Sequence, residues 1–260
     1  LKKQLLEKAN RDSAVYPLSY GQKALYFLYV NSPESPAYNV SFSARIVSSL
    51  NVEALKKSFQ KLVNRHSSLR TNYKLEDGKP VQVVHGYQEV SFTRIDVSEL
   101  DENSLRNLVI EKSREPFDLE NGKVLRVYLF SKSENDNVLL ISIHHISTDG
   151  RSVEVMMEEL GKLYESEASG KSDSLLPSEK HYHEFISAQE EFVNSDKAKS
   201  QLEYWTNELS GEQTDLDLPN DRPRPPMQTF NGSTVYFELD ADLVDKLKQV
   251  SKDSGATLFA

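Results

Sequence analysis

Apolar residues recur along this chain with two different periods, and the alternation of the two periods constrains the fold more than any other feature. Helical spacing predicts four amphipathic helices, at residues 19–30, 51–65, 101–115 and 151–165. Runs that alternate or are rich in β-branched and aromatic residues predict strands between them, at residues 41–47, 69–75, 81–84, 90–97, 124–131 and 138–145. Because helices and strands are mixed throughout, we expect an α/β or α+β fold.

One turn and two interruptions organise these elements. The pair Asp77-Gly78 lies between two strand segments and predicts a tight hairpin. Polar stretches at 166–180 and 211–232 have compositions that do not form a packed core, so either is a candidate domain boundary. The remaining segments predict one or two helices at 182–211, a strand at 234–239 and a helix at 240–254. The chain starts without methionine and stops on an apolar run, so we expect a piece of a longer protein.

Composition excludes several classes of function. The chain has 260 residues, which suits one or two domains, and a formal net charge of −9 that disfavours nucleic acid as a partner. Its apolar runs are far shorter than the roughly 20 residues of a membrane helix, and its first residues lack the apolar core of a signal peptide. Cysteine is absent, which suits a cytoplasmic protein. Small molecules and other proteins are left as partners.

Residues 143–150, Ile-His-His-Ile-Ser-Thr-Asp-Gly, form the stretch that indicates chemistry. Side chains alternate along a strand, so the rings of His144 and His145 should point to opposite faces. A buried imidazole tends to stay neutral and can act as a base at physiological pH, and we assign that task to His145. Asp149-Gly150 then opens a helix whose first backbone N–H groups can stabilise an oxyanion.

Three other interpretations compete with catalysis by the histidine turn. Histidines at a strand end are commonly packed side chains, and an aspartate before a helix is commonly a cap. A metal site is disfavoured, because the other histidines show no spacing that converges on the turn; they are His66, His85, His181 and His183. A covalent nucleophile is disfavoured because the chain has neither cysteine nor a Gly-x-Ser-x-Gly motif.

The motifs together resemble one family. Residues 144–150 are similar to the HHxxxDG signature of nonribosomal peptide synthetase condensation domains, whose fold resembles chloramphenicol acetyltransferase: a mixed sheet flanked by helices. Residues 18–28 resemble the opening helix of that family, and residues 65–73 resemble its second motif, RHxxLRTxF. Further similar stretches are residues 116–119 with 122 and 125–127, and residues 182–185, which resemble a Tyr-x-Asp-Phe motif.

The resemblance implies a role for each matching residue. His145 would be the catalytic histidine, acting as a base toward an amine or positioning it, and the backbone N–H of Gly150 would assist at the oxyanion. His144 would be structural, and Asp149 would be held in a salt bridge by an arginine of the second motif. That arginine would be Arg70, with Arg65 as the alternative. Ser147 and Arg151 would line the substrate channel.

The resemblance also implies an activity and partners. Residues 1–170 would form the N-terminal lobe, and residues 171–260 the linker and the truncated beginning of a C-terminal lobe, so this piece alone should be weakly active or inactive. The reaction would be amide-bond formation between carrier-bound thioesters in a peptide or hybrid polyketide/peptide assembly line. The chain would bind no cofactor or metal of its own, since 4′-phosphopantetheine is carried by the partner carrier proteins.

Alternatives within and outside this family remain open. Epimerisation of a carrier-bound aminoacyl group and ester formation with a hydroxyl acceptor use the same superfamily signature. A catalytically silent module would only dock carrier proteins and neighbouring synthetase modules. Cyclisation is disfavoured, because the subgroup that performs it carries an aspartate where His144 stands.

Overall fold

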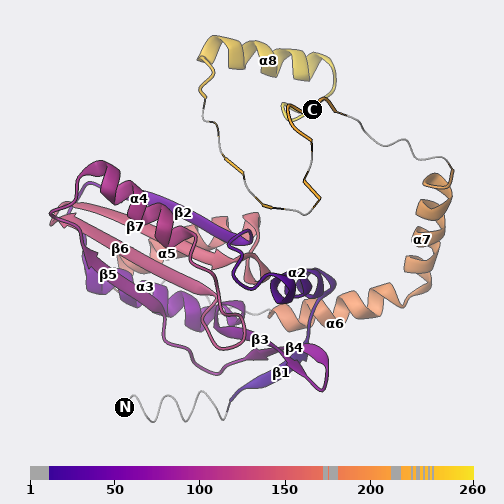
Figure 1. The fold of residues 1–260 in the computed structure, drawn as a ribbon, viewed down its shortest axis with the longest axis horizontal. Coiled ribbons are helices and arrows are strands. Elements are labelled where there is room, and N and C mark those ends of the chain that lie inside the picture. The colour runs from indigo at the N-terminus through magenta and orange to yellow at the C-terminus, as the bar shows by residue number, and fades with distance from the viewer. Residues whose placement is uncertain are drawn as a thin grey trace. The chain divides into compact units, whose positions relative to one another are not determined.

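A computed structural model gives the fold (Figure 1). It describes residues 12–171, 175, 181–211, 218–223, 225–226, 229–230, 232–233, 235 and 237–260. The chain divides into two compact units, residues 1–213 and residues 214–260. In the second unit the helix α8 spans Ala241–Asp253 and is capped by the side chain of Asp240. The first unit contains the histidine turn and is described below.

A four-stranded sheet forms the centre of the first unit. Its order is β2-β7-β6-β5, with β2 at Asn39–Ile46, β7 at Asp136–His144, β6 at Leu125–Ser133 and β5 at Ser91–Asp96. The pairs β2–β7 and β6–β7 are antiparallel, whereas β5 runs parallel to β6. The sheet is therefore mixed, as expected from the resemblance.

Helices cover both faces of this sheet (Figure 1). On one face, α3 (Val52–Arg65) and α5 (Gly150–Ser169) pack against Leu139, Ile141 and Ile143 of β7. On the other face, α4 (Glu102–Ser113) packs against Leu140. Alternate residues of β7 thus contribute to two separate cores, which explains why this strand is apolar on both sides.

A three-stranded antiparallel sheet lies beside α2 (Tyr20–Asn31). Its order is β1-β4-β3, with β1 at Ala14–Pro17, β4 at Lys79–Val84 and β3 at Thr71–Glu76. The turn between β3 and β4 places Asp77 at φ 51° and Gly78 at φ 73°, which confirms the predicted hairpin, since such turns need positive φ at both central positions. Strand β1 was not predicted.

The helices and strands predicted in the first unit are confirmed with shifted boundaries. Residues 69–75 divide into a 3₁₀ turn, η1 (Ser67–Arg70), and β3, while the predicted strand 138–145 ends at His144 and continues into a second 3₁₀ turn, η2 (His145–Ser147). Residues 182–211 form two helices, α6 (Tyr182–Val193) and α7 (Asp196–Glu208).

Some predictions fall partly outside the described residues. In the expected strand 234–239, residues 234 and 236 are not described, and the described residues 235 and 237–239 are not in a strand. Much of the two polar stretches also lies outside the described residues, and the division into lobes at residue 170 stays a prediction. Within the described residues, no helix has both the length and the apolar character needed to cross a membrane.

Candidate functional site

The histidine turn begins where β7 stops pairing. His144 is the last residue of the strand, and its backbone N–H donates to the carbonyl of Val124 at 3.0 Å. The next residue, His145, still donates its N–H to the carbonyl of Tyr38 at 2.9 Å but starts the 3₁₀ turn. Because the backbone turns at this point, the two imidazoles enter different environments. One ring is buried and the other is exposed.

His144 is the buried ring, with only 5% of its surface exposed. Its Nδ1 accepts a hydrogen bond from the backbone N–H of Ile146 at 3.1 Å, and the ring of Phe117 meets it edge-on at 5.9 Å. Burial, helped by the electrostatic influence of the neighbouring Arg126 and His145 side chains, lowers the pKa of His144 to about 4. His144 is therefore neutral at physiological pH and serves as a hydrogen-bond acceptor within the turn.

His145 is the exposed ring, so our prediction of a buried imidazole at His145 is wrong: the buried ring is that of His144. Its Nδ1 lies 2.7 Å from the carbonyl oxygen of Thr148. A carbonyl only accepts, so Nδ1 carries the hydrogen and the neutral ring keeps its free lone pair on Nε2. The Thr148 carbonyl thus selects the tautomer and orients the ring, which is how a general base is commonly held.

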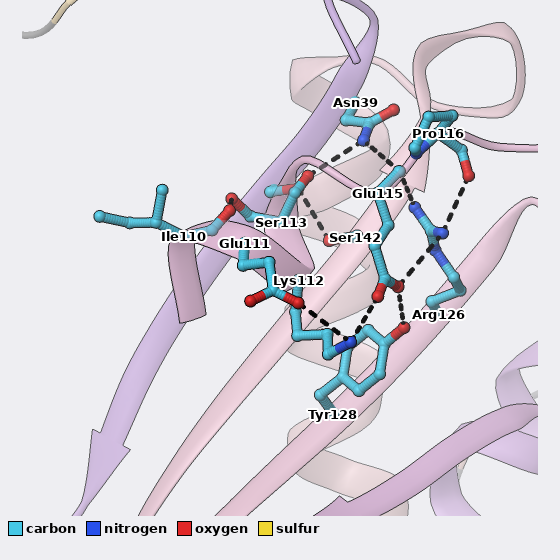
Figure 2. Close-up of polar contacts among 11 residues, drawn as sticks. Asn39, Ile110, Glu111, Lys112, Ser113, Glu115, Pro116, Arg126, Tyr128 and Ser142 are labelled. Carbon is cyan, nitrogen blue, oxygen red and sulfur yellow. Dashed lines mark hydrogen bonds and ion pairs between the residues drawn. The ribbon is translucent and has the colours of Figure 1, made fainter. Parts of the chain in front are cut away.

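A polar network fixes the segment that supports His144 (Figure 2). Figure 2 shows the Glu115 carboxylate among Tyr128, Lys112 and Arg126; the Lys112 ammonium lies at 2.6 Å and the Tyr128 hydroxyl donates to the same group. Burial and this carboxylate raise the pKa of Tyr128 to about 12. These contacts hold the end of α4 and the residues after it against β6.

Arg126 connects this network to the histidine. Its guanidinium donates to the carbonyls of Glu115 and Pro116, the latter at 3.0 Å, and lies 3.8 Å from the centre of the Phe117 ring. Asn39 donates to the carbonyls of Ser113 and Glu115 at 3.0 and 2.9 Å (Figure 2). The Phe117 ring that contacts His144 therefore also contacts a cation, which is favourable over an aromatic face.

Asp149 caps α5 and forms no ion pair with the arginines of the second motif. Its Oδ1 accepts from the backbone N–H and the hydroxyl of Ser152 at 2.8 and 2.6 Å, and these bonds hold the pKa of the carboxyl below its usual range. Arg65 instead binds Glu159 of α5 at 2.9 Å, and His66 contacts the same carboxylate at 2.6 Å. The predicted salt bridge from Asp149 to Arg70 or Arg65 is therefore wrong.

Arg70 makes no ion pair with Asp149, although both residues lie in the described part of the chain. Within the described part of the chain, its Nε and Nη1 atoms are buried without a hydrogen-bond partner, and burial lowers the pKa of the guanidinium. The predicted ion pair between Asp149 and Arg70 is absent because Ser152, three residues along the helix, already donates two hydrogen bonds to the Asp149 carboxylate. The described residues hold no group of three His, Asp or Glu side chains arranged as metal ligands.

Two cavities meet at the turn. The first, of about 290 Å³, lies toward α3 and α5, and its lining combines apolar side chains such as Met156 with His66 and Arg151. The second, of about 260 Å³, lies toward α2 and α6 and contains His145 and Tyr182 in its wall. Five small or polar residues line both cavities: Ser68, Ser147, Thr148, Asp149 and Ser152.

The predicted site residues occupy different places around these cavities. Ser147 lines both of them and Arg151 lines the first, where it also pairs with Glu154 at 2.6 Å. Gly150 is the first residue of α5, and a Cβ added there would meet no atom within 4 Å, so packing alone does not require glycine. The roles assigned to Ser147, Gly150 and Arg151 stay predictions.

Several residues of the site were not anticipated as such. Gln22 and Tyr182 line the second cavity, and Ser68 lies between the two. The Tyr182 hydroxyl lies 3.0 Å from that of Ser19, the N-cap of α2, and so joins α6 to α2. The signal was available, because Gln22, Ser68 and Tyr182 all belong to stretches that resemble family motifs. The directions in which these side chains point could not be predicted from the sequence.

Comparison with known proteins gives a consistent result. A family model named Condensation domain matches residues 12–260. A linear gramicidin synthase from Brevibacillus parabrevis is 37% identical over 263 residues, covering 100% of this chain and 3% of the synthase. Surfactin synthase subunit 1 from Bacillus subtilis (strain 168) is 34% identical over 244 residues, covering 94% of this chain and 6% of the synthase.

Solved structures share the fold. The X-domain from teicoplanin biosynthesis has a TM-score of 0.79 at 25% identity, covering 92% of this chain and 53% of that one. The epimerization domain from the third module of tyrocidine synthetase B has a TM-score of 0.80 at 21% identity, covering 95% of this chain and 55% of that one. The chain thus spans about half the length of these structures and a few per cent of the synthases.

Proposed function

This chain belongs to the condensation-domain family of nonribosomal peptide synthetases, and from that membership we propose that it forms an amide bond between two carrier-bound substrates. The donor is an acyl or peptidyl thioester, and the acceptor is the amine of an aminoacyl thioester. The observation that carries the proposal is the arrangement of His145, whose Nδ1–H is held by the Thr148 carbonyl, while its ring lies in the wall of the second cavity and its Nε2 has no hydrogen-bond partner among the described residues.

The proposed step uses His145 as a general base or as the group that positions the amine. The acceptor nitrogen attacks the thioester carbonyl, and Nε2 of His145 takes the proton that the nitrogen loses as the C–N bond forms. The C–S bond then breaks, and the departing thiolate receives this proton from Nε2, which returns His145 to its neutral form. The backbone N–H of Gly150, at the positive end of α5, is proposed to stabilise the oxyanion of the intermediate.

The two cavities support a reaction between two substrates. They approach the turn from different sides and share the wall made by Ser147, Thr148 and Asp149. We assign one cavity to each thioester arm, with both arms contributed as 4′-phosphopantetheine by carrier-protein partners of neighbouring modules. The thioester is already activated, so this step needs no nucleotide.

The test is a reconstitution with the full-length protein that contains this chain. Donor-loaded and acceptor-loaded carrier proteins are mixed with it, and intact-protein mass spectrometry follows the mass of the acceptor carrier. Transfer of the donor acyl group to the acceptor amine is the expected result. Hydrolysis of the donor without transfer, or no reaction beyond carrier binding, would contradict the proposal.

The same assay separates the alternatives that share this base. Epimerisation would introduce deuterium from D₂O at the acceptor α carbon without any change of donor, because the base would remove and return a carbon-bound proton. Ester formation would require an acceptor hydroxyl and would give a product cleaved by mild base. Transfer to an amine without solvent exchange at the α carbon supports amide formation.

A further inference from the structure

A chain of buried polar side chains leads from the three-stranded sheet to the turn that carries His145. It starts at Gln82 of β4, which donates to the Pro17 carbonyl at 2.8 Å and to Oε1 of Gln22 at 3.5 Å. Gln22 also receives the backbone N–H of Ser19 at 3.0 Å, so its Oε1 is fixed as an acceptor. Its Nε2 is then the donor, and it reaches the Tyr73 hydroxyl at 3.3 Å and the carbonyl of Ile146 in the turn at 3.5 Å.

Tyr73 is the part of this chain that reaches Ser147, beside the direct contact of Gln22 with the Ile146 carbonyl. Its side chain is fully buried, and its hydroxyl receives Nε2 of Gln22 at 3.3 Å. The same hydroxyl lies 3.0 Å from Oγ of Ser147 and 3.4 Å from the carbonyl of Ile146. A phenol donates one hydrogen; the Ile146 carbonyl can only accept it, whereas the Ser147 hydroxyl can accept or donate. Because Gln22 fills the acceptor side, the phenol hydrogen is directed to the turn.

The hydroxyl therefore acts on the two residues that follow His145. Ile146 and Ser147 separate the ring from Thr148, the residue whose carbonyl holds Nδ1 of His145. Ser147 also lines both cavities. If the phenol hydroxyl is removed, Ser147 loses its buried partner, and the turn that carries the Thr148 carbonyl loses one of the contacts that fix it.

We propose that Tyr73 is a positioning residue for His145, acting through Ser147 and Ile146 and not by contact with substrate. The inference rests on the proposed role of His145. It assigns a task to a buried tyrosine whose ring alone would already fill the core formed with Leu18, Tyr26 and Ile146. The ring packs, and the hydroxyl holds the turn.

The test compares Tyr73→Phe, Ser147→Ala and the double variant in the full-length protein. Each single change should lower kcat for product formation about threefold to tenfold, the range expected for one intramolecular hydrogen bond, with KM for both carrier substrates unchanged. The double variant should be no slower than either single variant, because both changes remove the same contact. The matched control is Tyr26→Phe. Tyr26 belongs to the same core cluster, but its hydroxyl donates to the Glu120 carboxylate at 3.3 Å and does not contact the turn.

Several outcomes overturn the proposal. They are an unchanged kcat in Tyr73→Phe, multiplicative losses in the double variant, and an equal loss in Tyr26→Phe. If Tyr73→Phe fails to fold, Ser147→Ala removes the contact from its partly exposed side and should show the same loss of kcat with KM unchanged. The role of His145 is tested separately by His145→Ala. If that variant is inactive while Tyr73→Phe is fully active, only the positioning inference fails.

Discussion

The buried ring of His144 makes the stability of the chain depend on pH. Its pKa is lowered from 6.5 to about 4 by burial, so the folded state binds a proton much less readily than the unfolded state does. At pH 7.5 the ring is neutral in both states. As the pH falls through 6.5 the unfolded ring is protonated first, and folding stability is lost until about pH 4.

The size of the effect follows from those two values. At pH 5 the protonated form of the unfolded histidine outnumbers its neutral form about thirtyfold. In the folded state the neutral form of the buried histidine outnumbers its protonated form about tenfold. Linkage then predicts that lowering the pH from 7.5 to 5 costs about 2 kcal/mol of stability through His144 alone. Carboxylates contribute little in this window, because their reference pKa values lie below 5.

The assay is urea denaturation of the wild-type chain and of His144→Asn at pH 7.5 and pH 5. Asparagine keeps an acceptor near the position of Nδ1 for the Ile146 N–H but does not titrate. Burial and Arg70 also lower the pKa of His85, which is present in both proteins, so its contribution cancels. The wild type should lose about 2 kcal/mol more than the variant between the two pH values. An equal loss in both would refute the argument.

Other substitutions test separate parts of the structure by the same denaturation assay. Gly122→Ala should destabilise by about 1–3 kcal/mol, since its Cβ would lie 2.5 Å from the Asp118 carbonyl oxygen, whereas Gly161→Ala, with open space in the exposed α5 position, should stabilise by up to about 1 kcal/mol. Asp149→Ala should cost about 1 kcal/mol as a lost cap, and Asp149→Ser should restore most of it; a loss of about 3–5 kcal/mol would instead indicate a buried ion pair.

The periodic elements of the fold were readable because each depends on a local pattern. The helix α3 buries Leu55, Phe59, Leu62 and Val63 at the predicted spacing, and β7 alternates between two cores as its sequence indicates. Strand β1 could not be predicted, because four residues carry little periodicity and their pairing with β4 is fixed by long-range hydrogen bonds. The separation of the strands into two sheets was likewise a tertiary outcome.

The candidate site was readable in its residues but not in its contacts. The sequence predicted a strand, a turn and a capped helix around the histidines, and these are present. It did not indicate that the strand ends between the two rings, which decides which ring is buried. The contact between Arg65 and Glu159 could not be predicted either. The two residues lie 94 positions apart in the sequence and meet through the packing of α5 on α3.

The central claim is that His145 serves the transfer step, and replacing it in the full-length protein tests that claim most directly. Single-turnover transfer between loaded carriers is measured for His145→Ala, with His181→Ala as an exposed control histidine outside both cavities. Loss of a general base predicts a rate about 10² to 10⁴ times lower in His145→Ala, with carrier binding unchanged and the control at the wild-type rate. A His145→Ala protein that forms product at the wild-type rate would contradict the account.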